Sequence, residues 1–166
     1  MHEICAAVKE IVRRNDDVTV IFPVHKNPIV RETVYPELDG VERVILIEPP
    51  DYVPFVHLIK ESYLILTDSG GVQEEAPSLG KPVLVLRKTT ERPEAIEYGT
   101  AKLIGSSKKN IVDTVCELCA NEIKYKQMAN AVNPYGDGKA CDRIIEVIKY
   151  FFNLKTERPE EFNICV

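Results

Sequence analysis

The sequence lacks an apolar run long enough to cross a bilayer. A membrane-spanning helix needs about 18 or more consecutive apolar residues, and no stretch of this chain approaches that length. The first residues, MHEICAAVKEIVRR, carry acidic and basic side chains throughout, unlike the apolar centre of a secretory signal. We therefore expect a cytoplasmic protein that has no membrane partner.

A surplus of positive charge is also missing. The chain has 21 Lys and Arg residues against 26 Asp and Glu residues, which gives a net charge of −5. Proteins that bind nucleic acid through its phosphate backbone present a basic face. Nucleic acid is therefore not an expected partner.

The cysteines do not form the pattern of a disulfide framework. Their number is odd, and most of them lie in apolar helical patterns, which is typical of reduced thiols in a core. They are Cys5, Cys116, Cys119, Cys141 and Cys165. The C-x-x-C pair at 116 and 119 lies inside an amphipathic stretch, whereas a redox pair opens a helix after a strand. The sequence thus predicts neither a redox centre nor a metal site, and no cofactor.

What is present fits one globular domain. The 166 residues are 45% hydrophobic and 28% charged, which is ordinary for a folded domain of this length. No internal repeat or low-complexity linker divides the chain. Residues 155–166 mix charges with little periodicity, so we expect a domain over residues 1–154 followed by a tail or lid.

Short apolar runs alternate with segments of helical period. The runs that predict strands are Val18–Phe22, Val44–Ile47, Tyr63–Leu66, Pro82–Leu86 and Lys102–Ile104. Continuous apolar strands are typical of a parallel sheet that is covered on both faces. The predicted fold class is therefore α/β, a doubly wound, mainly parallel Rossmann-like sheet with helices on both faces.

The chain begins with a helical pattern that no strand precedes. A doubly wound domain normally starts with a strand, and that first strand is usually central. Without it, two neighbouring strands would be left unpaired. We therefore expect a domain that lacks its first strand and belongs to a longer parent.

The strongest functional signal is LILTDSGGVQEE, in which a strand runs into a Ser-Gly-Gly turn and then a helix. Backbone N–H groups and the helix dipole at such a turn favour a phosphate, and Ser69 adds a hydroxyl. Gly70 and Gly71 allow close approach of the ligand. The alternative is a plain glycine turn that Asp68 or Ser69 caps.

Polar side chains near this turn complete a candidate site. Glu75 follows Gly71 by one helical turn, where its carboxylate suits a ribose diol or is simply solvated. The segment RKTTERPE at 87–94 follows the next strand and could neutralise a diphosphate, with the Arg92 fork suited to bidentate contact, or form an ordinary charged loop.

Two further residues allow opposite interpretations. His25 follows a strand, where it could contact a sugar or phosphate, although a satisfied surface histidine is more common. Phe55 begins a helix near the strand edge, where its ring could stack on a base or fill the core.

The segments PVHKNP, TDSGGVQEEAPSLGKPVLVLRKTTERPE and NPYGDGKA resemble, in order and spacing, the C-terminal half of the non-hydrolysing UDP-N-acetylglucosamine (UDP-GlcNAc) 2-epimerases. The resemblance covers nearly the whole chain. It implies a two-domain GT-B-like parent in which the C-terminal domain holds UDP.

The resemblance also implies roles for individual residues. Phe55 would pack by the uracil, and the backbone near Pro50 would contact the edge of the base. Phosphate would be held by Ser69, Gly70 and Gly71, and the ribose by Glu75, with Arg92 at the cleft. His25 matches a histidine at a second, regulatory site of some bacterial members. Pro50 is a position at which other members differ, so only its backbone role carries over.

The resemblance implies that the intact parent interconverts UDP-GlcNAc and UDP-ManNAc by anti elimination and re-addition of UDP. The acid and base carboxylates come from the N-terminal domain, so we assign no catalytic residue to this chain and expect binding without turnover. Possible partners besides UDP-GlcNAc or UDP are a second copy or the missing N-terminal domain. The alternatives are a non-catalytic nucleotide-sugar-binding or regulatory module and, less favoured, the donor-binding half of a glycosyltransferase.

Overall fold

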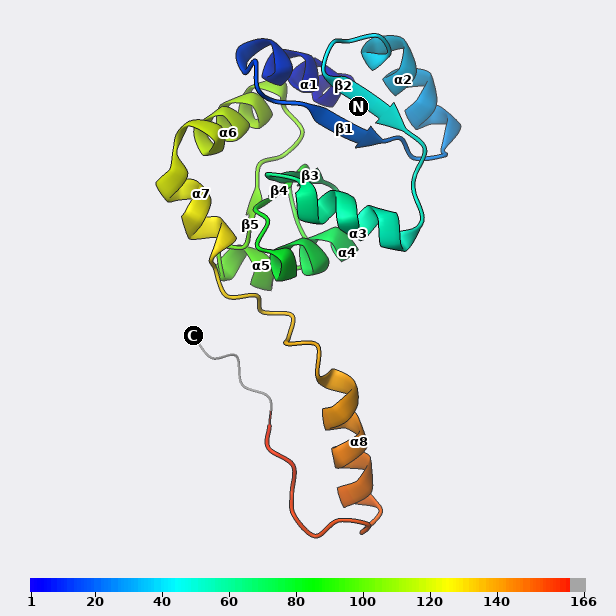
Figure 1. The fold of residues 1–166 in the computed structure, drawn as a ribbon, viewed down its shortest axis with the longest axis vertical. Coiled ribbons are helices and arrows are strands. Elements are labelled where there is room, and N and C mark those ends of the chain that lie inside the picture. Colours follow the sequence, from blue (N-terminus) through cyan, green and yellow to red (C-terminus); the bar gives the residue numbers. More distant parts are fainter. Residues whose placement is uncertain (162–166) are drawn as a thin grey trace.

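The computed structural model describes residues 1–161 and forms an α/β body from which one helix projects (Figure 1). The strands are β1 (Val20–Pro23), β2 (Val44–Ile47), β3 (Ile65–Thr67), β4 (Val83–Val85) and β5 (Ala101–Leu103). The helices are α1 (His2–Arg14), α2 (Pro28–Leu38), α3 (Tyr52–Glu61), α4 (Gly70–Glu75), α5 (Pro93–Glu97), α6 (Lys108–Ala120), α7 (Glu122–Ala129) and α8 (Ala140–Phe151), with a 3₁₀ turn, η1 (Ala76–Leu79), after α4.

All five strands pair in parallel, as the alternation of strands and helices predicts. Strand β1 pairs with β2, while β4 lies between β3 and β5. Each observed strand overlaps the apolar run that predicts it. The fold class expected from the sequence is therefore confirmed.

The parallel strands form two sheets rather than one. Among the described residues, β1 pairs only with β2, and β3 pairs only with β4. Both β1 and β3 therefore keep one edge without a strand partner. This is the arrangement expected if a central strand were absent between them, because both its neighbours then lose a hydrogen-bonding partner.

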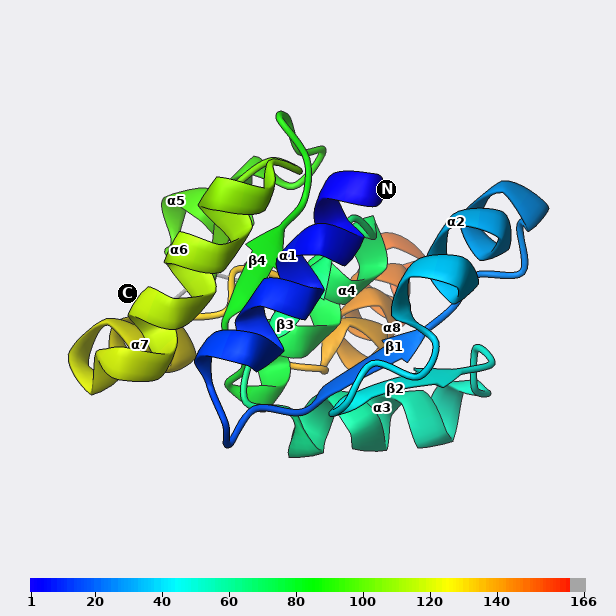
Figure 2. The same cartoon turned by 90° about the horizontal axis from the view of Figure 1, so that it is seen from above.

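Helix α1 joins the two sheets into one body. Ala7 and Ile11 pack with Leu84 of β4, whereas Cys5 and Val8 pack with the cluster that covers β1 and β2. Figure 2 shows α1 between α6 and α2, and it contacts both helices. Its amphipathic pattern thus buries apolar side chains against both sheets at once.

The middle strand of the larger sheet is buried on both faces. Leu84 packs with residues of α1 and α6, while Val83 and Val85 point to the opposite side and pack with residues of α3, α4 and α5. Alternate side chains of a strand point to opposite faces. A continuous apolar run is consequently required here, as in other doubly wound folds.

Helix α8 projects from the body and leaves an apolar surface exposed (Figure 1). Its large apolar side chains are 40–75% exposed, and they include Ile144, Ile145, Val147, Ile148, Tyr150 and Phe151. Exposed apolar surface of this extent on one element is typical of an interaction site.

The end of the chain has no regular structure over residues 155–161, and the remainder of the predicted tail, with Cys165, lies outside the described residues. Within residues 1–161, no helix is both long and apolar enough to span a membrane. Cys5, Cys116, Cys119 and Cys141 are free thiols. Burial raises the pKa of Cys119, the opposite of the shift found in reactive redox thiols.

Candidate functional site

The Ser-Gly-Gly turn joins the carboxyl end of β3 to α4. Ser69 precedes the helix with an extended backbone (φ −82°, ψ 133°), but its side chain makes no capping hydrogen bond to α4. Its own backbone N–H donates to Thr67 Oγ1 at 3.0 Å. The first turn of α4 is therefore not closed by the Ser69 hydroxyl, as it would be in a plain capped turn.

Gly70 and Gly71 are glycines that the fold itself does not require. Six of the eight glycines in the chain have positive φ, but these two do not. A β-carbon on Gly70 or Gly71 would meet no heavy atom nearer than 3.9 Å apart from the residues adjoining it. Neither backbone strain nor crowding within the protein explains them. The absence of side chains leaves space beside the turn.

Arg92 lies beside this turn. Its Nη2 and Cζ atoms stand 3.9 and 4.0 Å from the position of a β-carbon on Gly70. Its Nε donates to Glu74 Oε1, and this hydrogen bond raises the pKa of the guanidinium. Of the three cations in the segment 87–94, Arg92 is the one that the fold brings to the glycines.

Glu75 lies beside Gly71, the second glycine of the turn. Its Oε1 stands 3.9 Å from the position of a β-carbon on that glycine, and its side chain is half-buried. The Glu75 charge, and then a hydrogen bond to it, raise the pKa of Tyr52 at the start of α3. Tyr52, which is 65% exposed, is a site residue that the sequence analysis missed.

Phe55 and Pro50 lie in and just before α3, respectively. Phe55 is half-buried and packs against the cluster that contains Ile59, Val72 and Ala76. Its ring thus contributes to the core and is also partly exposed. Pro50 is half-buried in the segment that leads from β2 to α3.

Gln73 is a second residue that sequence reasoning missed. Only 1% of it is exposed, although its side chain is polar. Its Nε2 donates to the Ser69 carbonyl at 3.0 Å, and its Oε1 accepts a hydrogen bond from Thr90 Oγ1 at 2.7 Å. Gln73 therefore connects the Ser-Gly-Gly turn to the loop before Arg92.

The segment NPYGDGKA reaches the site through Tyr135. The Tyr135 hydroxyl accepts a hydrogen bond from the Ala95 N–H at 3.2 Å, in the first turn of α5. Asn133 holds Tyr135 through a hydrogen bond from the Tyr135 N–H at 3.1 Å, and burial raises the Tyr135 pKa. The sequence predicts only a turn here, whereas in the structure this turn also supports α5, the helix that follows Arg92.

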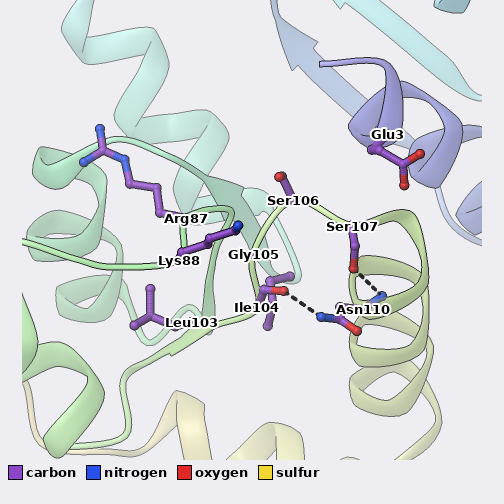
Figure 3. Close-up of a pocket in the computed structure, with 9 residues that line it drawn as sticks. All are labelled: Glu3, Arg87, Lys88, Leu103, Ile104, Gly105, Ser106, Ser107 and Asn110. Carbon is purple, nitrogen blue, oxygen red and sulfur yellow. Dashed lines mark hydrogen bonds between the residues drawn. The ribbon is translucent and has the colours of Figure 1, made fainter.

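Arg87 and Lys88 are separated from Arg92 and line a hollow at the ends of β4 and β5 (Figure 3). The hollow also includes Glu3 and the loop from Leu103 to Ser107. In it, Glu3 Oε2 accepts the Lys108 N–H at 2.9 Å, so a protein carboxylate already occupies the start of α6. The three cations of segment 87–94 consequently do not form one cluster.

His25 lies in the loop after β1 and is exposed. Its Nδ1 accepts a hydrogen bond from the Asn27 N–H at 3.1 Å. Asn27 in turn caps α2 by accepting the Ile29 N–H at 3.0 Å. Because β1 and β3 belong to different sheets, His25 is positioned by a different part of the fold from the Ser-Gly-Gly turn.

The described residues contain no group of three or more His, Cys, Asp or Glu side chains that could hold a metal ion. The candidate site therefore consists of an open glycine turn, a flanking arginine and a flanking carboxylate. A positive helix end and a guanidinium favour an anion, while a carboxylate favours hydroxyl donors. This combination suits a ligand that carries both phosphate and sugar hydroxyls.

Comparison with known proteins gives concordant matches. The chain is 57% identical over 146 residues to a UDP-N-acetylglucosamine 2-epimerase of Yersinia pestis, covering 88% of this chain and 39% of that protein. Against MnaA of S. aureus, solved as a co-structure with UDP, the TM-score is 0.92 at 51% identity, over 98% of this chain and 44% of that one. Against the Neisseria meningitidis UDP-GlcNAc 2-epimerase bound to UDP-GlcNAc, the TM-score is 0.85 at 48% identity, over 89% and 40%.

The chain thus spans about two fifths of the length of these relatives. The family model described as UDP-N-acetylglucosamine 2-epimerase matches residues 1–149. This match covers most of the chain, including every element that builds the candidate site. We conclude that the chain belongs to the UDP-N-acetylglucosamine 2-epimerase family.

Proposed function

We propose that residues 1–154 form the UDP-binding domain of a UDP-N-acetylglucosamine 2-epimerase. The observation that carries the proposal is the pair of glycines at the start of α4, which have no backbone reason to be glycine and lie beside Arg92. The related S. aureus and N. meningitidis proteins were solved with UDP and UDP-GlcNAc bound, respectively.

The proposed contacts follow the chemistry of the ligand. The diphosphate lies on the Ser69–Gly71 turn, where N–H groups and Arg92 offset its charge. Glu75 accepts hydrogen bonds from the ribose hydroxyls. The uracil lies by Phe55, with the backbone at Pro50 at the edge of the base.

The reaction of the intact parent is the interconversion of UDP-GlcNAc and UDP-ManNAc. In the proposed scheme UDP leaves C1 by anti elimination as the proton leaves C2. UDP then returns to C1 on its original face, and a proton is added to C2 from the face opposite to the one it left. This chain binds UDP, the leaving group, and none of its residues is assigned as the acid or base. The chain alone therefore binds the nucleotide sugar without turnover.

The proposal includes a second domain or a second copy of the chain as a partner. The open edges of β1 and β3 and the exposed apolar side chains of α8 fit a chain that works with a second domain or a second copy. The four free thiols fit the reducing cytoplasm, where we place the protein.

His25 is proposed to serve a separate, regulatory nucleotide-sugar site. Its Nδ1 is engaged by the Asn27 N–H, which leaves Nε2 to contact a ligand. His25→Ala is expected to leave UDP affinity at the Ser-Gly-Gly turn unchanged and to abolish any second binding event. Calorimetry with UDP-GlcNAc measures both.

A turnover assay tests whether the catalytic acid and base lie in another domain. Incubation of the 166-residue chain with UDP-GlcNAc, followed by proton NMR, is expected to show no UDP-ManNAc. Formation of UDP-ManNAc by this chain would contradict the assignment of the acid and base to another domain. Saturable binding without turnover fits both the epimerase domain and a non-catalytic nucleotide-sugar module. Restored epimerisation on addition of a relative's N-terminal domain would favour the epimerase.

A further inference from the structure

The buried side chain of Gln73 is chemically unusual for its place in the fold. Gln73 and Thr100 are the buried polar residues among those that the structure describes. Burial of an amide is unfavourable unless its donors and acceptor find partners. The partners of Gln73 are therefore informative about its role.

Both ends of the Gln73 amide are hydrogen-bonded, and its orientation is fixed by chemistry. The Ser69 carbonyl can only accept, so the group 3.0 Å from it must be the donating Nε2. Oε1 then faces the Thr90 hydroxyl, which donates to it at 2.7 Å. A flipped amide would place an oxygen against the Ser69 carbonyl oxygen.

The connection continues from Thr90 to Arg92. The same Thr90 Oγ1 accepts the backbone N–H of Arg92 at 3.0 Å. Three hydrogen bonds thus run in one direction, from the Arg92 N–H through the Thr90 hydroxyl and the Gln73 amide to the Ser69 carbonyl. Bonds aligned in this way polarise one another and resist separate rearrangement.

The two ends of this relay are the two parts of the candidate phosphate site. Ser69 begins the glycine turn after β3, and Arg92 immediately precedes α5, which follows β4. The Arg92 side chain is half-buried and pairs with Glu74, the residue next to Gln73. The buried side chain of Gln73 is therefore linked, through Thr90, to the backbone N–H of the residue that carries the guanidinium.

We propose that Gln73 is a positioning residue that sets Arg92 against the Ser-Gly-Gly turn through Thr90, so that both engage the same diphosphate. This inference rests on the proposed function. It assigns a role in binding to a residue that does not itself contact the ligand. Replacement of Gln73 should therefore weaken the binding of ligands that carry the diphosphate, whereas a merely structural glutamine would show no such selectivity.

The test uses the 166-residue chain and an isosteric pair of variants. Thr90→Val keeps the shape of the side chain but removes both hydrogen bonds, whereas Thr90→Ser keeps the hydroxyl. Calorimetry with UDP and with uridine measures the two parts of the ligand separately. We expect Thr90→Val and Gln73→Met each to weaken UDP binding about tenfold, the effect of one lost hydrogen bond between Arg92 and the diphosphate. Uridine affinity should stay unchanged, and Thr90→Ser should restore UDP affinity.

Thr100→Val is the matched control. Thr100 is 1% exposed and its hydroxyl donates to the Ala95 carbonyl at 3.1 Å, so this variant also loses a buried hydrogen bond but leaves the relay intact. It is expected to lower the Tm with UDP affinity unchanged. A double-mutant cycle should show that Gln73→Met and Thr90→Val together cost little more UDP affinity than either alone.

The outcomes separate the two claims. If the wild-type chain fails to bind UDP, the proposed function is wrong and the positioning role is lost with it. If the wild type binds UDP but Thr90→Val and Gln73→Met bind it equally well, the positioning role alone is wrong. Equal losses for UDP and uridine would also overturn it, because they indicate a general loss of structure.

Discussion

The guanidinium of Arg92 lies against Gly70, with its Nη2 atom 3.9 Å from the point at which a β-carbon would stand on that glycine. Arg92 immediately precedes α5 and Gly70 begins α4, so the contact joins two loops that follow neighbouring parallel strands. Ligands of open parallel sheets bind at this edge. The glycines, the arginine and the carboxylate of the candidate site can each be tested by its own variant.

Gly71→Ala should separate stability from binding. The added methyl group meets no atom nearer than 3.9 Å apart from the residues adjoining it, and alanine favours helix over glycine, so we expect the free energy of unfolding to rise by about 0.5 kcal/mol. The methyl group would occupy the space that we propose for the phosphate, so UDP affinity should fall about tenfold or more. Thermal unfolding and calorimetry on the same samples measure both effects.

Gly80→Ala is the control for that experiment. Gly80 has φ +67°, and a β-carbon there would stand 3.4 Å from the Ala129 carbonyl oxygen. Alanine is strained in this conformation, so this variant should lower the Tm with UDP affinity unchanged in the folded fraction. Equal behaviour of the two alanine variants would contradict a ligand-related role for Gly71.

Arg92→Lys should weaken UDP binding selectively. Lysine keeps the charge but loses the planar fork, which suits phosphate in two-point contact. Loss of a charged hydrogen bond is worth about 1.5–3 kcal/mol, so UDP affinity should fall by about tenfold to a hundredfold. Uridine has no phosphate and should bind the variant and the wild type equally. A matching loss for uridine would place Arg92 away from the phosphates.

Glu75→Ala should remove the contribution of the ribose hydroxyls. The variant should bind UDP about tenfold more weakly, because a carboxylate that accepts two hydroxyl hydrogen bonds is lost. Against 2′,3′-dideoxy-UDP, wild type and variant should have equal affinity. Tyr52→Phe is a useful companion, since the charge of Glu75 raises the pKa of Tyr52. A loss of affinity that persists for the dideoxy ligand would assign Glu75 another role.

The apolar face of α8 should govern self-association of the isolated chain. Ile144, Ile148 and Phe151 recur at helical spacing and are 57%, 49% and 75% exposed. We expect the wild-type chain to associate in sedimentation velocity runs as concentration rises, and Ile148→Glu to shift it toward the monomer with UDP affinity unchanged. A wild type that stays monomeric at high concentration would argue against α8 as an interaction surface.

Acid should weaken the fold partly through Glu10 on α1. Hydrogen bonds from Arg13 and Arg14 lower the Glu10 pKa from 4.5 to about 2. Because the folded pKa is the lower one, this contribution is present above pH 4.5 and is lost as the pH falls toward 2. The Tm of wild type should therefore fall more than that of Glu10→Gln between pH 5 and pH 2.5, and identical slopes would contradict this.

The strands and the glycine turn could be predicted because their signals are continuous in sequence. A buried parallel strand requires an apolar run such as Val83–Val85, and the turn is a contiguous Ser-Gly-Gly after such a run. The hydrogen bond between Gln73 and Thr90 could not be predicted in this way. It joins residues 17 positions apart, and it depends on how far β3 and β4 bring their loops together.

The positions of the charged side chains after β4 could not be predicted from the sequence either. Arg87, Lys88 and Arg92 read as one basic cluster, but the chain turns between them, so that Arg92 faces Gly70 while the other two line the hollow beside Glu3. Tyr135 is a further example, since its contact with Ala95 spans 40 residues. The packing of loops determines which side chains meet. Local sequence patterns do not predict this packing.

The measurement that tests the central claim most directly is a calorimetric titration of UDP into the 166-residue chain, with Gly71→Arg as the blocked variant. We predict saturable heat with about one UDP per chain for the wild type. The variant should give none, since an arginine side chain fills the open turn, and its unchanged circular dichroism would show that it is folded. Absence of heat with the wild type, or equal binding by Gly71→Arg, would contradict a UDP site at the Ser-Gly-Gly turn.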